Sequence, residues 1–196
     1  TQLAGAGDAD PFDGKGVTGM HAIERILFAD VTPARVVDFE KALPGYAKAA
    51  FPATAEQAVE FKTKLVQKLI DDVTKLQSQW TPEAIDVGTA FQGLIALMRE
   101  QREKVNKAAT GEEESRYAQM TLFDLKNNLD GTAAAYELFR PWLSSKTSSD
   151  PATDGKSIDK ALLADLQQLR DLYAGYTGDA VPEPPATWSS DTPSAT

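Results

Sequence analysis

The stretch TAEQAVEFKTKLVQKLIDDVTKLQSQW, residues 54–80, decides the fold class of this chain. Its apolar residues recur every three or four positions, the spacing that aligns side chains along one face of an α-helix. These residues are Ala58, Phe61, Leu65, Leu69, Val73 and Leu76. Thr54 stands where an N-cap is expected, and Gln57 follows three residues later, as in a capping box. The sequence therefore predicts one long amphipathic helix over this stretch.

The same spacing recurs in most of the remaining sequence, and no segment shows the apolar-polar alternation of a strand. Further helices are predicted over about 18–29, 33–43, 81–108 and 113–142, and a last one carries inward-facing residues from Ile158 to Tyr173. Short polar connections between helices favour an antiparallel bundle. We therefore predict an all-α fold, with a helical bundle over residues 17–178. An Asp- and Gly-rich loop (1–16) precedes the bundle, and a flexible tail rich in Pro, Ser and Thr (179–196) follows it.

Composition excludes several classes of function. The chain has 29 acidic and 20 basic residues, for a formal charge of -9, and this field disfavours nucleic acids and anionic membranes as partners. A cation is a more suitable ligand. The sequence contains no cysteine, which rules out disulfides, thiolate metal sites and cysteine nucleophiles.

The chain's only histidine, His21, precedes Glu24 by three residues in GMHAIERILF, residues 19–28. One helical turn would place the imidazole and the carboxylate side by side, an arrangement that suits two ligands of one metal ion. Helical bundles complete such iron sites with carboxylates from facing helices. The alternative is a core histidine satisfied by Glu24 or by a backbone carbonyl. The helix is otherwise apolar, where an unpartnered glutamate would be costly to bury, and this favours the metal interpretation.

A second polar group lies in GEEESRYAQMTLFDLKNNLDG, residues 111–131. On a helix that begins at Glu113, five side chains would project within about 40° of one line. They are Glu113, Tyr117, Thr121, Asp124 and Asn128. This stripe offers oxygen ligands that could face His21 and Glu24 across the bundle. A solvated helix face is the alternative.

The two segments resemble conserved blocks of the imelysin-like proteins, which include the EfeO-type periplasmic components of bacterial iron uptake. The first block is G-x-H-x-x-E, formed here by Gly19, His21 and Glu24. The second is a G-E-E-x-R-Y segment followed by an aromatic-aspartate pair and an N-x-x-G element. Its matching residues are Gly111, Glu112, Glu113, Arg116, Tyr117, Phe123, Asp124, Asn128 and Gly131. The match departs from the family in two ways: one extra residue precedes Arg116, and Thr121 stands where relatives often have aspartate, so we allow for a site with fewer ligands.

The resemblance implies an exported bacterial protein of the periplasm or cell surface that binds iron, or else zinc or copper. Its implied metal ligands are His21, Glu24, Asp124 and Glu113, supported by Tyr117, Arg116 and Asn128. A membrane permease or a peroxidase-like protein of an iron-uptake system is the implied partner. The family usually has helices before the first block, and the start TQLAGAGDAD lacks the features of a signal peptide, so we expect a processed or shortened chain.

Three alternatives remain open at this point. One is a metallopeptidase, although a single histidine cannot form the H-E-x-x-H zinc motif, and the sequence favours a role other than catalysis. Another is a polysaccharide- or protein-binding module with a structural motif, in which Trp80, Trp142 and Trp188 could stack on sugars. The third concerns Asp8, Asp10 and Asp13, which resemble a cation-binding loop but miss the EF-hand spacing by one residue, and a plain turn explains them as well.

Overall fold

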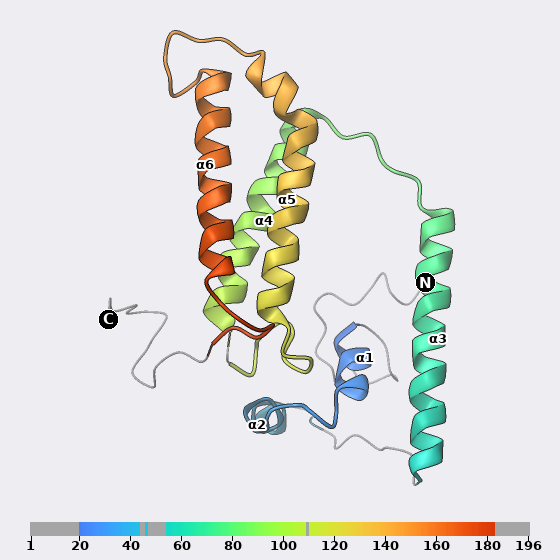
Figure 1. Ribbon diagram of the computed structural model, residues 1–196. Coiled ribbons are helices and arrows are strands. Elements are labelled where there is room, and N and C mark those ends of the chain that lie inside the picture. Colours follow the sequence, from blue (N-terminus) through green and yellow to red (C-terminus); the bar gives the residue numbers. More distant parts are fainter. Residues whose placement is uncertain (1–19, 44–45, 47–53, 109, 183–196) are drawn as a thin grey trace. The chain divides into compact units, whose positions relative to one another are not determined.

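A computed structural model describes residues 20–43, 46, 54–108 and 110–182 of the chain. Every regular element in these ranges is a helix, which confirms the all-α prediction (Figure 1). The helices are α1 (Met20–Leu27), α2 (Ala34–Ala42), α3 (Ala55–Gln79), α4 (Val87–Lys107), α5 (Thr121–Ser144) and α6 (Gly155–Ala174). None of these helices is both long enough and apolar enough to span a bilayer.

The chain divides into two compact units. Unit 1 comprises residues 1–84 and 116–118, and unit 2 comprises residues 85–115 and 119–196. The predicted loop over residues 1–16 and most of the predicted tail lie outside the described residues. The prediction of one bundle over residues 17–178 stays a prediction.

Helices α3 and α4 begin with the same kind of N-cap, but only α3 begins where the sequence predicted. Helix α3 begins as predicted, because the Thr54 hydroxyl accepts a hydrogen bond from the Gln57 N–H at 3.2 Å. The prediction that α4 begins at Thr81 and Pro82 is wrong, since residues 80–86 precede the helix. Its N-cap is Asp86, whose carboxylate accepts the Thr89 N–H at 2.8 Å. That hydrogen bond holds the pKa of the Asp86 carboxyl below its ordinary value.

The predicted helix over 113–142 begins later than expected. Residues 114–119 form turns, and Gln119 has a φ of 58°, a left-handed conformation that interrupts a right-handed helix. Helix α5 therefore begins at Thr121, and its first N–H groups, those of Leu122 and Phe123, donate to the Asp179 carbonyl at 2.8 and 3.1 Å. The single polar stripe predicted from Glu113 to Asn128 is wrong, because Glu113 and Tyr117 lie before the helix.

In unit 2, helices α4, α5 and α6 run antiparallel, with α5 packed against both neighbours (Figure 1). The buried side of α5 carries apolar residues at helical spacing, namely Leu122, Leu125, Leu129 and Tyr136. At the far end of this bundle, the Phe91 ring lies 5.6 Å from that of Phe139 and 6.1 Å from that of Trp142. These contacts form a continuous apolar core along α5.

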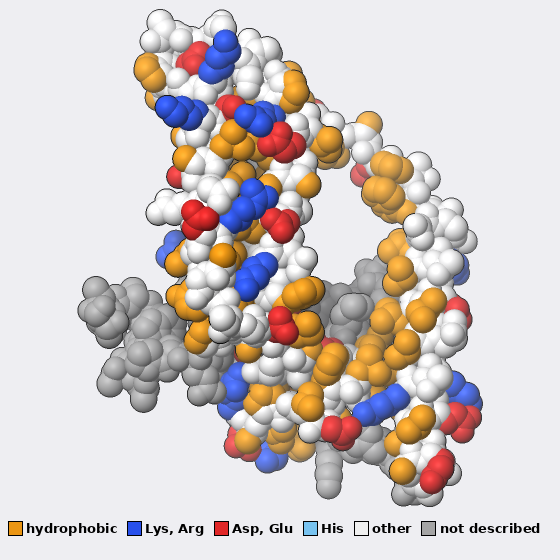
Figure 2. All heavy atoms as spheres, in the orientation of Figure 1, with side chains coloured by type: hydrophobic (Ala, Val, Ile, Leu, Met, Phe, Trp, Pro, Cys, Tyr) orange, Lys and Arg blue, Asp and Glu red, His pale blue; other side chains and the backbone are white. Residues whose placement is uncertain are grey.

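Among the described residues of unit 1, four apolar side chains are buried, and one of them is Tyr117. The buried ones in the described residues before position 84 are Ile26, Val36 and Leu65. Helix α3 carries apolar side chains that are exposed along much of its length in Figure 2. They include Val59, Ile70, Val73 and Leu76, each more than half exposed, as is Trp80, the C-cap that follows the helix. In the described part of unit 1, apolar side chains on α3 are thus more exposed than those on the buried side of α5 in unit 2.

Candidate functional site

Helix α1 brings His21 and Glu24 together, as the sequence predicted for one helical turn. The His21 Nδ1 lies 3.3 Å from the Glu24 Oε2, and both side chains are largely buried, at 16% and 18% exposed. The other carboxylate oxygen of Glu24, Oε1, accepts the backbone N–H of Ala118 at 3.0 Å. One glutamate thus contacts both the histidine and a segment 94 residues further along the chain.

A buried carboxylate on α2 makes the second connection to this segment. The Glu40 Oε1 accepts hydrogen bonds from Arg25 Nε at 2.8 Å and from the Tyr117 hydroxyl at 2.6 Å. Glu40 is 3% exposed and Tyr117 is fully buried. Burial, followed by the bond to Glu40, raises the pKa of the Tyr117 phenol well above its ordinary value. The phenol therefore stays protonated and remains a donor to Glu40.

Arg116 completes this part of unit 1. Its guanidinium carbon lies 5.5 Å from the centroid of the Tyr117 ring, within the range of a cation–π contact. Residues 116–118 therefore present a guanidinium, a phenol and a backbone N–H in succession, of which the last two donate to Glu40 on α2 and to Glu24 on α1.

Sequence reasoning missed Glu40. The residue lies one helical turn after Val36, on the side of α2 that is buried, and both residues are buried. A carboxylate at such a position needs partners, because an unpaired charge is costly to bury. The position of Glu40, one helical turn after the apolar Val36, was therefore a usable sequence signal for a buried polar network.

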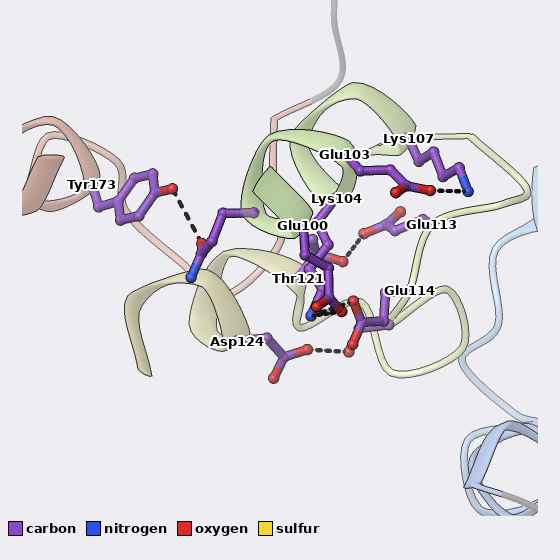
Figure 3. A network of polar contacts seen from close by, with 11 residues as sticks. Glu100, Glu103, Lys104, Lys107, Glu113, Glu114, Thr121, Asp124 and Tyr173 are labelled. Atoms are coloured by element: carbon purple, nitrogen blue, oxygen red, sulfur yellow. Dashed lines mark hydrogen bonds and ion pairs between the residues drawn. The ribbon is translucent and has the colours of Figure 1, made fainter. Parts of the chain in front are cut away.

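The other two predicted metal ligands, Glu113 and Asp124, lie in unit 2 (Figure 3). Glu113 is 1% exposed, and its Oε1 accepts the Thr121 hydroxyl at 2.5 Å. Asp124, in the first turn of α5, accepts the Ser115 hydroxyl at 2.5 Å. Each carboxylate thus has a neutral hydroxyl as a partner. The backbone carbonyl of Asn128 accepts the Thr132 hydroxyl at 2.8 Å.

A buried lysine joins α4 to the turns that carry Glu113. Lys104 Nζ lies 2.7 Å from Glu114 and 3.4 Å from Glu100, and the lysine is 9% exposed (Figure 3). Burial acts to lower the pKa of Lys104, but the hydrogen bond and charge of Glu114, helped by Glu100, outweigh it and raise that pKa. Lys104 therefore stays charged and neutralises part of the acidic run in this unit.

The structure thus pairs His21 with Glu24 and gives Glu113 and Asp124 separate partners. Across the described ranges, no three His, Asp or Glu side chains are grouped closely enough to hold a metal ion. The Asp8, Asp10 and Asp13 loop, Gly19 and Trp188 lie outside these ranges. The assignment of metal ligands from the sequence remains a prediction.

Comparison with known proteins gives a consistent family assignment. The family model described as Imelysin matches residues 3–187. An "Efem/EfeO family lipoprotein" of Staphylococcus haemolyticus (strain JCSC1435) is 29% identical over 160 residues, which cover 77% of this chain and 53% of that protein. A protein of the same name from Staphylococcus aureus (strain MSSA476) matches with the same identity and coverage. The chain therefore spans about half the length of the curated relatives it matches, and no solved structure matches it.

Proposed function

The chain belongs to the imelysin family, and from this premise we propose that it is an exported bacterial protein that binds iron, or another divalent cation, for uptake. The relatives are named Efem/EfeO family lipoproteins, which supports a place in an iron-uptake system at the cell surface or in the periplasm. A membrane permease or a peroxidase-like protein is the partner that such a role requires. Binding, rather than catalysis, is the proposed activity.

The observation that carries this proposal is the contact between the two sequence blocks. His21 and Glu24 come from the first block, and the Ala118 N–H that Glu24 accepts follows directly after Arg116 and Tyr117 of the second. This hydrogen bond limits the rotation of the Glu24 carboxylate and keeps its Oε2 beside His21. A ligand pair held in place in this way loses less conformational entropy when a metal binds.

The chemistry of the pair suits a borderline-hard cation. An imidazole nitrogen and a carboxylate oxygen are ligands that iron, zinc and copper all accept. Because the metal and the proton compete for the same imidazole nitrogen, acidification opposes binding. A site with few protein ligands would also release its ion more readily, as transfer to a permease requires.

Glu113 and Asp124 are the additional ligands that we propose, with Tyr117, Arg116 and Asn128 in supporting roles. Each of the two carboxylates accepts a hydrogen bond from a hydroxyl. The variants Glu113→Gln and Asp124→Asn test this assignment separately from that of His21 and Glu24.

Calorimetric titration of the metal-stripped chain tests the proposal, with Zn²⁺ as a redox-stable probe and Fe²⁺ under anaerobic conditions. We expect saturable binding that His21→Ala abolishes and that Glu24→Gln weakens about tenfold or more. Glutamine keeps an oxygen for the Ala118 N–H, so this variant removes charge without removing the contact. Asp38→Ala is the control, because Asp38 likewise forms an i,i+3 pair, with Lys41 on α2, and that pair is exposed. Absence of binding, or equal binding by the His21→Ala variant, would overturn the proposal.

Peptidase activity is the second candidate, because the name of the matching family model describes a peptidase. The same pair would then hold zinc and leave a position for water. Incubation of the zinc-loaded chain with a mixture of labelled peptides checks this candidate by mass spectrometry. We expect no cleavage, and cleavage that His21→Ala removes would establish the peptidase instead.

A further inference from the structure

Unit 2 contains an open cavity of about 510 Å³ between α4, α5, α6 and the segment that follows α6. Its apolar lining includes Met98, Val105, Leu122, Leu125, Leu169 and Leu172. Leu122 and Leu125 are buried, at 3% and 1% exposed, whereas Val105 and Leu172 are 43% and 54% exposed. The size and the apolar lining are those of small-molecule sites, which measure about 300–1,000 Å³. An apolar ligand would remove the exposed Val105 and Leu172 side chains from water.

One buried polar side chain in this lining lacks a partner. Gln101 is 3% exposed, and its Oε1 accepts the Tyr173 hydroxyl at 3.4 Å (Figure 3). Its amide nitrogen, Nε2, is buried and has no hydrogen-bond partner within the described part of the chain. A buried N–H donor without an acceptor is unfavourable, and native structures rarely leave one unsatisfied. A ligand with an acceptor oxygen would satisfy it.

A positive charge lines the same cavity. Arg102 also lines the cavity and is exposed, and it makes no ion pair or hydrogen bond among the described residues. The neighbouring Glu103 is instead paired with Lys107, at 2.7 Å. A guanidinium and an amide N–H that line one cavity offer several donors and no acceptor, which matches a carboxylate group.

We propose that this cavity binds a medium-chain carboxylic acid. The alkyl chain lies against the leucines of α5 and α6, and the carboxylate accepts hydrogen bonds from the Gln101 amide and the Arg102 guanidinium. The cavity lining includes neither His21 nor Glu24, so decanoate binding and metal binding can be tested independently. It assigns to unit 2 a ligand of its own.

Calorimetric titration with decanoate tests the proposal, with decanol as the uncharged comparison. We expect saturable decanoate binding and at least tenfold weaker decanol binding. Arg102→Gln should weaken decanoate binding about tenfold, whereas the control Arg99→Gln, an exposed position on the same helix that does not line the cavity, should not. Equal binding of decanol and decanoate, or no effect of Arg102→Gln, would overturn the carboxylate assignment.

Leu172→Glu tests whether decanoate binds in this cavity. Leu172 is half exposed, so it should tolerate a charged side chain without disturbance of the core. The new carboxylate lines the cavity and repels an anionic ligand, so decanoate binding should be lost while the circular dichroism spectrum is unchanged. Unchanged decanoate binding in this variant, or no binding of decanoate to the original folded chain, would show that the cavity is not the site.

Discussion

In unit 2, helices α4, α5 and α6 pack around buried leucines, whereas in unit 1 residues 116–118 contact α1 and α2 through hydrogen bonds to two carboxylates. The unit 2 core continues from Leu122 to Tyr136 along one side of α5. In unit 1, the Tyr117 hydroxyl and the Ala118 N–H donate to Glu40 and Glu24, which lie far away in the sequence. The unit 2 bundle is stabilised by burial of apolar side chains, which requires no bound ligand. The unit 1 arrangement depends on charge and directed hydrogen bonds, which a bound cation can alter.

The largest effect is expected in the core of unit 2. Leu125→Ala removes a side chain that is 1% exposed and leaves a cavity, which should lower the free energy of unfolding by about 2–5 kcal/mol. Chemical denaturation followed by circular dichroism measures the loss. Leu138→Ala is the control, because Leu138 on the same helix is 80% exposed and should change stability little. Equal losses in the two variants would contradict the assignment of the core.

The next largest effect is expected at Tyr117. Tyr117→Phe keeps the buried ring but removes the hydrogen bond to the Glu40 carboxylate, which should cost about 1.5–3 kcal/mol, the range for hydrogen bonds to charged groups. Tyr176→Phe is the control, because Tyr176 is 45% exposed. Chemical denaturation of both variants distinguishes loss of the buried hydrogen bond from the general effect of losing a hydroxyl. A loss no greater than that of the control would show that the polar network does not stabilise unit 1.

A smaller effect, with a defined pH dependence, is expected at Tyr136. Its hydroxyl donates to Asp159 at 2.7 Å, and that bond, followed by the contact with Arg140, holds the pKa of Asp159 below its ordinary value of 3.8. A carboxyl whose folded pKa is lowered adds stability above that ordinary value, and this stability is lost as the pH falls through the folded pKa. Below about pH 4, the free energy of unfolding should therefore fall less in Tyr136→Phe than in the original chain. Identical acid denaturation curves for Tyr136→Phe and the original chain would show that the hydrogen bond to Asp159 adds no pH-dependent stability.

The sequence predicts the helices of this chain better than it predicts their contacts. The periodicity of 54–80 and the Thr54 cap are local properties, and α3 begins where they indicate. The start of α5 depends on the left-handed Gln119 and on the distant Asp179 carbonyl, and neither is encoded in a periodic pattern. The i,i+3 spacing of His21 and Glu24 likewise fixes their contact, because both residues lie on one turn.

The contacts that α1 and α2 make with residues 116–118 were not predictable in the same way. Glu40 and Tyr117 are 77 residues apart, and their hydrogen bond depends on tertiary packing rather than on local spacing. The stripe of Glu113, Tyr117 and Asp124 assumed a helix where the chain forms turns, so residues expected on one face lie on different elements. Burial of a charged residue at an inner helix position, as at Glu40, is the pattern that indicates such a network.

Hydrogen exchange with and without a bound metal ion tests the central claim, that His21 and Glu24 of unit 1 form the metal site. With Zn²⁺ added to the metal-stripped chain, we predict slower exchange in α1 and at the Ala118 N–H, which Glu24 accepts. Exchange in the core of α5 and in α6 should be unchanged, and His21→Ala should remove the protection. Protection confined to α4, α5 and α6, or protection of α1 that persists in the His21→Ala variant, would contradict the account.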